Sequence, residues 1–426
     1  MLNDSPPKPV IVSSVRLTLI LVLLLGLHPV ATYLYLPSLP LLQRELGIPA
    51  EIAQWSLSAL IISFAFGQVL CGPLADCWGR RPVLLWGLGM LVAASIAATM
   101  TNDVDVLLAA RVIQGLGVAA AGVCARAVLR DLYAPLEGVR LLSLGFTWVG
   151  VIALAGPPLG AALAEWGGFR SALGMLAVFS ALVLAAVWLC LPETSHASGE
   201  RDPRARTGLL AWPRMLRHPT FSAYTALAAA SYAGHYVFLV QSPFVLMDER
   251  GLNAGQYALA LSASSAVHLC GTMMCRYWLR GHGIRAPVRW AACATLAGGL
   301  SMAGLAWSGV LSPWAVILPQ WLFVFGHAIH QSCGQAAVSA PFPSLAGTAT
   351  SLSGFLLTIG ALLLGELLKT HISPGIGGLA YGVGICSALT AAIAWSIVQI
   401  YGDLNKVKEV GLTRRSAAST GGWPLR

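Results

Sequence analysis

The stretch GPLADCWGRRPV, residues 72–83, stands between two long apolar runs and decides how the chain is organised. The run before it is WSLSALIISFAFGQVLC (55–71), and the run after it is LLWGLGMLVAASIAATM (84–100). Three charged residues crowd into this short stretch, although only 10% of the whole chain is charged. The stretch is therefore a polar loop between two hydrophobic segments, and the nature of those segments decides the fold class.

The composition excludes a water-soluble globular protein. Hydrophobic residues make up 57% of the 426 residues, and the mean hydropathy is +0.73. Soluble domains carry about 25% charged residues, well above the fraction found in this chain. Apolar runs of about 20 residues have the length that crosses a bilayer as helix, and these runs lack the period-2 alternation of a barrel strand. The sequence therefore predicts an all-α membrane protein.

The apolar runs predict twelve transmembrane helices in two six-helix halves. The N-terminal half holds the runs 17–39, 54–72, 83–101, 104–126, 141–164 and 170–191. The C-terminal half holds the runs 219–244, 255–279, 289–308, 314–335, 348–369 and 376–400. The chain divides into a first half (1–191), a polar arginine-rich linker (192–218), a second half (219–402) and a tail (403–426). Two such halves predict pseudo-symmetric repeats, and the first run, without a cleavage pattern, is interpreted as a retained helix.

The positive charges predict the orientation of the helices in the membrane. Of the 26 Lys and Arg residues, Arg111 falls inside a predicted span and four fall in loops on the side away from the termini. Those four are Arg44, Arg170, Arg250 and Lys369. The remaining 21 lie on the side of the termini, which the positive-inside rule assigns to the cytoplasm. The net charge of +9 is thus a topology signal, and nucleic acid is not an expected partner.

The loop at 72–83 carries a family signature. It matches G-x-L-A-D-x-x-G-R-R-P-V, and on this motif the chain resembles the major facilitator superfamily. A weaker echo, GTMMCRYWLRGHGIR at 271–285, occupies the corresponding place in the second half but lacks the acid. In that family the loop clamps the cytoplasmic side and helps to gate transport. The resemblance implies gating roles for Gly72, Asp76, Gly79, Arg80 and Arg81.

Two further motifs support the resemblance. The run at 104–126 holds Arg111 and Gln114 in the frame R-x-x-Q-G-x-G, which the family uses in proton handling. A charge at membrane depth is costly and indicates function, although an arginine that reaches an interface is the alternative. GVIALAGPPLGAAL (150–163) resembles the antiporter motif of proton-linked exporters, with Ala161 at a position that is often glycine. We expect Gly156 and Pro157 to kink this helix, because proline removes a hydrogen-bond donor.

Three fragments resemble the Bcr/CflA subfamily of bacterial drug-resistance transporters. They are YLYLPSLP (33–40), ARAVLRDLY (125–133) and APFPSLAGTATSLSG (340–354). The chain departs from that subfamily at Tyr33, where relatives commonly have an acid. Within the runs, Glu366 is the one acid well inside an apolar stretch, and it stands near Lys369, which favours an ion pair. The usual carboxylate proton carrier is therefore missing.

Histidines replace acids as the candidate proton carriers. The runs contain five of them, scattered over four spans: His28, His235, His268, His327 and His330. A lone membrane histidine is usually a packing residue, but its unperturbed pKa near 6.5 suits proton exchange. We place His28 first, one turn before Thr32, and His327 second.

Helical spacing predicts which side chains would line a substrate cavity. Residues spaced by four fall on one face of three runs: His28 with Thr32 and the neighbouring Tyr33; Tyr232 with Tyr236; and Phe323, His327, Gln331 and Gln335.

No catalytic pattern competes with transport. The chain has no G-x-x-x-x-G-K-[ST] and no H-E-x-x-H, and its nine cysteines show no metal-ligand spacing. We expect a cofactor-free, monomeric transporter in the bacterial inner membrane, with both termini cytoplasmic. Its expected function is export of amphipathic or cationic compounds in exchange for protons. The alternatives are a metabolite or sugar transporter, including an uncoupled facilitator, and a membrane sensor that transports nothing.

Overall fold

The computed structural model describes residues 14–133, 135–194, 210–310, 312–342, 345–371 and 375–402. Within these ranges the chain is helical and contains no strand. The first half comprises α1 (Ser14–Tyr33), η1 (Leu36–Ser38), α2 (Leu39–Leu46), α3 (Ala50–Trp78), α4 (Arg80–Met100), α5 (Val104–Leu132) and α6 (Pro135–Cys190). The second half comprises α8 (Trp212–Leu216), α9 (Pro219–Pro243), η2 (Phe244–Glu249), α10 (Ala254–His282), α11 (Arg285–Trp307), α12 (Trp314–Ser339), α13 (Ala346–His371), α14 (Ile376–Trp395) and α15 (Ile397–Tyr401).

These helices confirm the predicted transmembrane fold. The fifth and sixth predicted spans are continuous in α6, but Gly167 and Gly168 leave helical geometry between them. Gly168 has a φ of +64°, a region that glycine enters without the steric cost of a side chain. The long element α6 is therefore two antiparallel spans joined by a glycine turn. Most of the predicted linker, residues 195–209, and the predicted tail, 403–426, lie outside the described residues.

Nine of the described helical segments are long and apolar enough to cross a membrane. One of the nine, Thr147–Cys190, contains both spans of α6. Two predicted spans, α9 and α12, are not among the nine, although they are 25 and 26 residues long. Both carry histidine, glutamine and serine in an otherwise apolar sequence, which lowers their hydropathy. Their polar residues single them out as the helices most suited to line a polar site.

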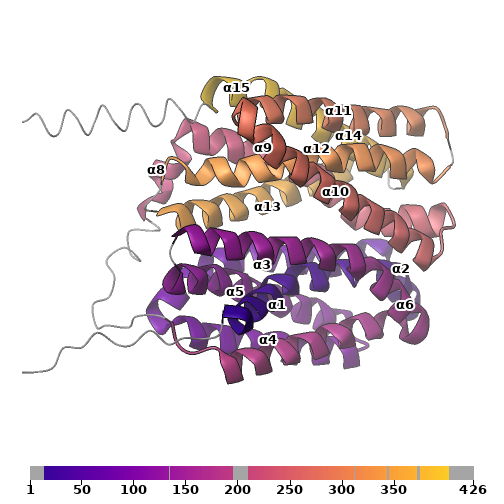
Figure 1. Ribbon diagram of the computed structural model, residues 1–426. Helices are drawn as coiled ribbons and strands as arrows, with labels where there is room; N and C mark the ends of the chain where they lie inside the picture. Colours follow the sequence, from indigo (N-terminus) through magenta and orange to yellow (C-terminus); the bar gives the residue numbers. More distant parts are fainter. Residues whose placement is uncertain are drawn as a thin grey trace, which may run out of the picture.

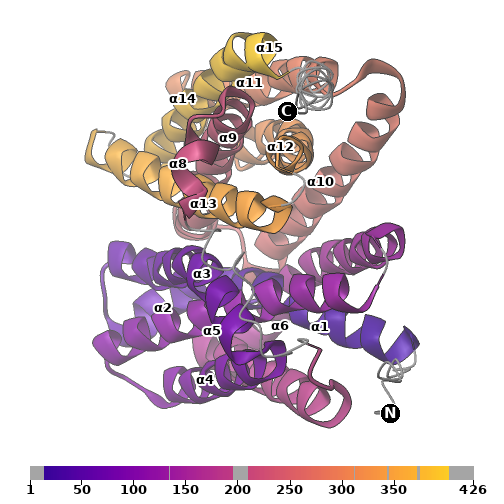
Figure 2. The ribbon, with the colours of Figure 1, turned by 90° about the vertical axis from the view of Figure 1, so that its left-hand side faces the viewer.

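The two halves form separate bundles that lie one above the other (Figure 1). Between them, α3 packs against α13 and α6 packs against α10. Turned by 90°, the molecule again shows the first half below and the second half above (Figure 2). We call the end that holds the start of α9 and the end of α15 the terminal face, and the other end of the bundle the opposite face.

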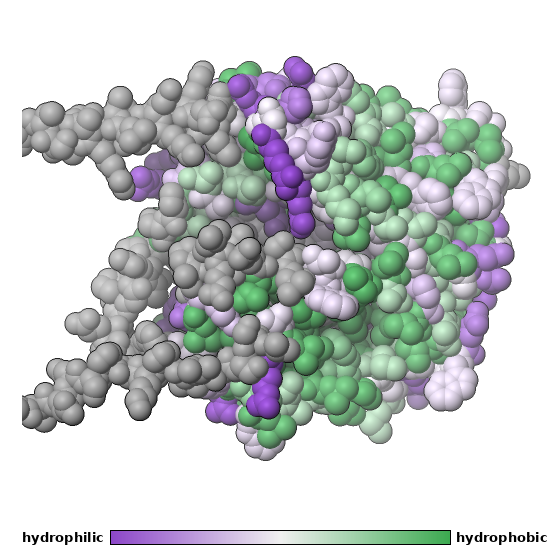
Figure 3. All heavy atoms as spheres, viewed as in Figure 1, coloured by the Kyte–Doolittle hydropathy of each residue, from purple (hydrophilic) through white to green (hydrophobic). Residues whose placement is uncertain are grey.

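The surface has the polarity of a membrane-spanning protein. Hydrophobic side chains cover the middle of the molecule, and hydrophilic ones gather toward its two ends (Figure 3). Exposed tryptophans mark both boundaries of this apolar zone: Trp78 and Trp188 at the terminal face, and Trp166 and Trp307 at the opposite face. Tryptophan favours the membrane–water interface because its ring is apolar and its N–H is polar.

Candidate functional site

The signature loop forms a network of charges at the terminal face. Arg80 Nη1 donates a hydrogen bond to Asp76 Oδ1, and Arg80 Nε donates to Asp131 Oδ2 at 3.1 Å. The loop turns at Gly79, whose φ of +96° favours glycine. Arg80 thereby joins the ends of α3 and α5 to the start of α4. Asp76 and Arg80, both expected to act in the gate, are bonded to each other, whereas Asp131 is a partner that sequence reasoning missed.

A third acid, Glu193, accepts hydrogen bonds at the start of α4. Its carboxylate accepts hydrogen bonds from the backbone N–H of Arg80 at 3.0 Å and of Arg81 at 3.1 Å. The first N–H groups of a helix have no partner within the helix, and the helix dipole favours a negative charge there. Arg81 Nη2 also donates to the Trp188 carbonyl at 2.8 Å. These bonds of Asp76, Arg80 and Arg81 connect the first half and Glu193 at the start of the predicted linker, and none of them reaches the second half.

Gly72 does not have the packing role that a glycine in this motif suggests. A Cβ placed on Gly72 would meet no described atom within 4 Å. In this conformation the position therefore tolerates a side chain, and no other helix approaches it closely.

Arg111 is completely buried about two turns after the start of α5. Its Nη1 donates to Gln114 Oε1 at 2.8 Å, and Gln114 Nε2 donates in turn to Ser95 of α4 at 3.1 Å. The guanidinium lies 3.7 Å from the ring centre of Tyr35, within the range of a cation–π contact. Arg111 Nε and Nη2 have no hydrogen-bond partner among the described residues. Gln114, which shares the sequence motif with Arg111, is thus its hydrogen-bond partner, whereas its ring partner Tyr35 lies outside that motif.

The glycines of the same motif bring α5 close to its neighbours. A Cβ on Gly115 would overlap the Ser63 hydroxyl and the Leu60 carbonyl of α3. A Cβ on Gly117 would lie 2.6 Å from the Gly87 carbonyl of α4. Small residues permit such close helix contacts in membranes. The motif thus positions a buried cation by packing its helix tightly on both sides.

The antiporter-like motif in α6 also makes a close contact. The φ and ψ angles stay helical through Gly156 and Pro157, and the non-helical residues of α6 lie at the later glycine turn. A Cβ on Gly156 would lie 3.1 Å from Tyr33 Cβ, and one on Gly160 would overlap the Leu34 carbonyl. The helix is therefore not interrupted at Pro157, the kink expected there stays a prediction, and this part of α6 packs closely against the end of α1.

Three of the five membrane histidines are not scattered but lie together. The ring centre of His327 is 4.9 Å from that of His235 and 5.8 Å from that of His268. The three residues come from α12, α9 and α10. His28 lies apart, 4.4 Å from the ring of Phe64, and His330 Nε2 faces the Val288 carbonyl of α11 at 3.4 Å. We call His235, His268 and His327 the histidine cluster.

The predicted cavity face of α12 changes steadily from buried to exposed. Phe323 and His327 are buried, Gln331 is half-buried with its Nε2 donating to the Ala228 carbonyl at 3.1 Å, and Gln335 is exposed. Exposure increases toward the terminal face, where α12 ends.

Of the polar residues predicted on the other two helices, Tyr232 lies against this face. Tyr232 stacks on His327 at 6.3 Å between ring centres, and it interacts electrostatically with Tyr33 of the first half. Thr32 is buried and its hydroxyl has no partner among the described residues.

The halves are joined near the opposite face. Arg44 of α2 forms an ion pair with Asp248 of η2. Deeper in the bundle, the hydroxyls of Ser58 and Tyr236 are 2.6 Å apart. Ser262 of α10 donates to a carbonyl of α6 at 2.8 Å. These bonds join the halves on the side toward which the predicted cavity face of α12 is buried.

Glu366 lies near the same closed end. It interacts electrostatically with Tyr236, and the side chain of its expected partner Lys369 falls outside what the structure describes.

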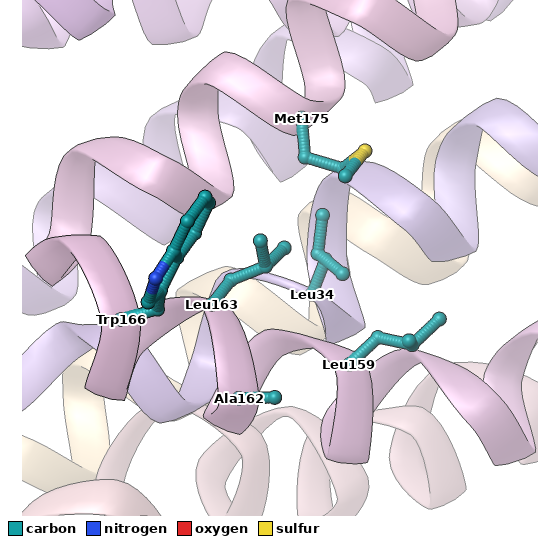
Figure 4. A pocket seen from close by; sticks show the side chains of 6 residues that line it. All are labelled: Leu34, Leu159, Ala162, Leu163, Trp166 and Met175. Atoms are coloured by element: carbon teal, nitrogen blue, oxygen red, sulfur yellow. The ribbon is translucent and has the colours of Figure 1, made fainter.

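A surface hollow in the first half has an apolar lining and is not a polar site. It measures about 330 Å³ and lies at the end of α1 and along both arms of α6 (Figure 4). Its lining is apolar: Leu34, Leu159, Ala162, Leu163, Trp166 and Met175. Trp166 is 88% exposed, so the hollow faces the lipid side of the bundle.

Comparisons with known proteins agree with this architecture. Residues 21–365 match the sequence profile of the Major Facilitator Superfamily. The chain is 29% identical to multidrug resistance protein D of Escherichia coli, over 86% of this chain and 91% of the relative. It is 30% identical to a chloramphenicol resistance protein of Pseudomonas aeruginosa, over 80% and 82%. A bicyclomycin resistance protein homolog of Haemophilus influenzae is 26% identical over 88% and 94%.

Solved structures share the fold. A D-xylose–proton symporter superimposes with a TM-score of 0.74 at 15% identity, covering 90% of this chain and 97% of the other. The peptide transporter POT superimposes with a TM-score of 0.72, covering 92% and 95%. The profile match and the sequence relatives named for multidrug and bicyclomycin resistance confirm the resemblance to Bcr/CflA transporters. The chain belongs to the major facilitator superfamily and is a multi-pass membrane transporter of small molecules rather than an enzyme.

Proposed function

We propose that this protein exports drug-like amphipathic or cationic compounds in exchange for protons. The observation that carries the proposal is the group of polar and aromatic side chains around the histidine cluster on α9, α10 and α12. The face of α12 that carries His327 becomes more exposed toward the terminal face. Relatives named for multidrug, chloramphenicol and bicyclomycin resistance support the substrate class. The excess of arginine and lysine at the terminal face supports placing that face in the cytoplasm of a bacterium, with the protein in the inner membrane as a monomer.

Alternating access accounts for the asymmetry between the two faces. The pairs Arg44–Asp248 and Ser58–Tyr236 join the halves near the opposite face. The predicted cavity face of α12, in contrast, becomes more exposed toward the terminal face. A substrate would enter from the cytoplasm in this state. Release would require these bonds to break while the halves close at the terminal face.

The signature loop would govern that closure. Asp76, Arg80 and Asp131 fix the relative position of three helix ends, so a movement of one is passed to the others. We assign Asp76, Gly79, Arg80 and Arg81 to the gate. Gly72 joins them, because its open surroundings leave room for another helix to approach. Gly156 and Pro157 belong to the packing of α6 on α1, which supports the same movement.

A histidine would carry the proton. In the described spans no carboxylate contacts the histidine cluster, and Arg111 is itself a cation. His28 and His327 are the candidates from the sequence. The position of His327 among two other histidines favours it over His28, whose described ring partner is a phenylalanine. Thr32, Tyr33, Tyr232, Tyr236, Gln331 and Gln335 complete the proposed substrate cavity.

Transport into everted membrane vesicles tests this proposal against its alternatives. Respiring vesicles that contain the protein should accumulate tetraphenylphosphonium or chloramphenicol, and collapse of the proton-motive force with a protonophore should stop accumulation. Vesicles with Arg111→Ala protein at equal expression are the matched control. Equilibration without accumulation would show a facilitator and refute proton coupling. Absence of any transport, across sugars and drugs alike, would favour the sensor.

A further inference from the structure

The histidine cluster is a compact stack of rings built from three helices. His327 lies nearly parallel to His235, with 21° between the ring planes, and nearly parallel to Phe323, with 12°. The Ser231 hydroxyl lies 2.8 Å from His327 Nδ1 and fixes the orientation of the ring. His235 Nδ1 is buried and has no partner among the described residues. The cluster therefore keeps unused hydrogen-bonding capacity inside an aromatic environment.

The groups around the cluster provide no negative charge. Among the described residues, the titratable groups that interact electrostatically with His327 are His235, His268 and His330. Tyr232 of α9 and Tyr33 of α1 are neutral phenols at physiological pH, and their hydroxyls can only share hydrogen bonds. Cys386 of α14 packs against α9 at Gly234, where its Cβ would lie 3.1 Å from a Cβ added to that glycine.

The nearest charged groups belong to other parts of the bundle. Glu366 of α13 interacts with Tyr236, one helical turn beyond Tyr232 and toward the closed opposite face. Arg111 is directed toward Tyr35 and Gln114 within the first half. Neither is among the groups that interact with His327.

Because the rings are so close, the cluster can hold one positive charge at a time. Two unit charges about 5 Å apart repel strongly at the effective dielectric constant of a protein, which disfavours a second proton by on the order of 100-fold. The same repulsion acts between an imidazolium and any organic cation placed against these rings. A proton and a cation would therefore exclude one another here without any carboxylate.

We propose that His235, His268 and His327, with Tyr232 and Phe323, form a binding site for one positive charge, either a proton or a large monovalent organic cation. The faces of aromatic rings attract cations. Burying a cation without a counter-ion costs less as its radius grows, because the charge is spread more widely. The site therefore selects delocalised cations of the tetraphenylphosphonium type over compact ammonium ions, and it rejects divalent cations. This inference rests on the proposed export function and names its coupling site.

Binding to the purified full-length protein tests the site independently of transport. Radiolabelled tetraphenylphosphonium should bind more weakly as the pH falls, by about tenfold per pH unit once the cluster protonates and by up to on the order of 100-fold in total. In weakly buffered solution, wild-type protein in that acidic range should release one proton for each tetraphenylphosphonium bound. Methyl viologen, a dication, and tetramethylammonium should not compete.

The variants separate the cluster from other groups. The triple variant His235→Gln, His268→Gln, His327→Gln should still bind tetraphenylphosphonium, but with an affinity independent of pH. His282→Gln, at the exposed end of α10 and outside the cluster, is the matched control and should keep the wild-type pH dependence. Elution of each variant as a single peak in size-exclusion chromatography establishes that it is folded, and the proton-release measurement on wild-type protein requires no variant.

Several results would overturn the proposal. They are pH-independent binding by wild-type protein, competition by methyl viologen, and pH dependence that survives the triple variant but disappears in Glu366→Gln. If vesicles show no proton-driven export but binding releases one proton, the proposed function fails and the site stands. If export is proton-driven but binding releases no proton, the site fails and the function stands.

Discussion

Replacing Gly115 by alanine tests whether the motif around Arg111 depends on close helix packing. The added methyl group would overlap the Ser63 hydroxyl and the Leu60 carbonyl, and it would lie 2.9 Å from Phe64 N. Two of these three atoms are backbone, so α3 and α5 must separate. Overpacking of this kind costs about 1–3 kcal/mol. The same change gains up to about 1 kcal/mol in helix propensity.

Gly89→Ala is the matched control for that propensity. Gly89 lies inside α4, and a Cβ there would meet no described atom within 4 Å. Because both substitutions change glycine to alanine within a helix, the propensity gain is common to them. The difference between the two variants therefore measures the overlap, and we expect Gly115→Ala to be less stable than Gly89→Ala by about 1–3 kcal/mol.

The assay is heating of the detergent-purified variants, followed by size-exclusion chromatography of the protein that remains monodisperse. Gly115→Ala should lose this fraction at a temperature several degrees lower than Gly89→Ala. Adding Ser63→Ala to Gly115→Ala removes one of the overlapping atoms and should restore part of the loss, since contacting residues couple energetically. Equal midpoints for the two single variants would refute the packing account of this motif.

Three further predictions concern the charged groups. Asp76→Asn should reduce efflux with membrane expression intact. Asp131→Asn should do the same, because Arg80 bonds both acids. Full drug efflux by either variant would contradict a gating role for that acid. Arg111→Lys should keep only part of the efflux activity, since an ammonium cannot stack on Tyr35 as a planar guanidinium does. Arg111→Ala should keep none. Normal efflux by the alanine variant would rule out a role of Arg111 in transport. Arg44→Gln should change thermal stability little, because exposed ion pairs contribute about 0–1 kcal/mol. Crosslinking the two thiols of the double variant Arg44→Cys, Asp248→Cys should block transport. Transport by fully crosslinked protein would show that this end need not open.

The spans could be predicted from the sequence because the bilayer leaves few options for the backbone. A helix needs about 20 apolar residues to cross the hydrocarbon of a bilayer. The sequence analysis therefore divided the continuous element α6 into two spans, and the structure has a glycine turn at that division. α9 and α12 were recoverable by length, although their polar residues lower their hydropathy. Those polar residues are the reason that both helices matter for the site.

The partners of the motif residues could not be predicted from spacing. Arg80 bonds Asp131, which lies 51 residues later, and its backbone N–H bonds Glu193, which lies 113 residues later. No helical periodicity connects positions so far apart, and only the packing of α5 and α6 around α4 brings them together. The same holds for Arg111, whose ring partner Tyr35 lies in the turn after α1.

The histidine cluster shows where single-helix reasoning stops. His327 was found because it shares a face with Phe323 and Gln331, and Tyr232 because it shares one with Tyr236. On α9, His235 lies within the same broad sector as these tyrosines, so a wider definition of the face would have included it. His268 offers no such pattern on α10, since it becomes significant only when three helices converge. A site made of one imidazole from each of three helices leaves only a faint signal in each of them, and its property of holding one positive charge exists only in their combination.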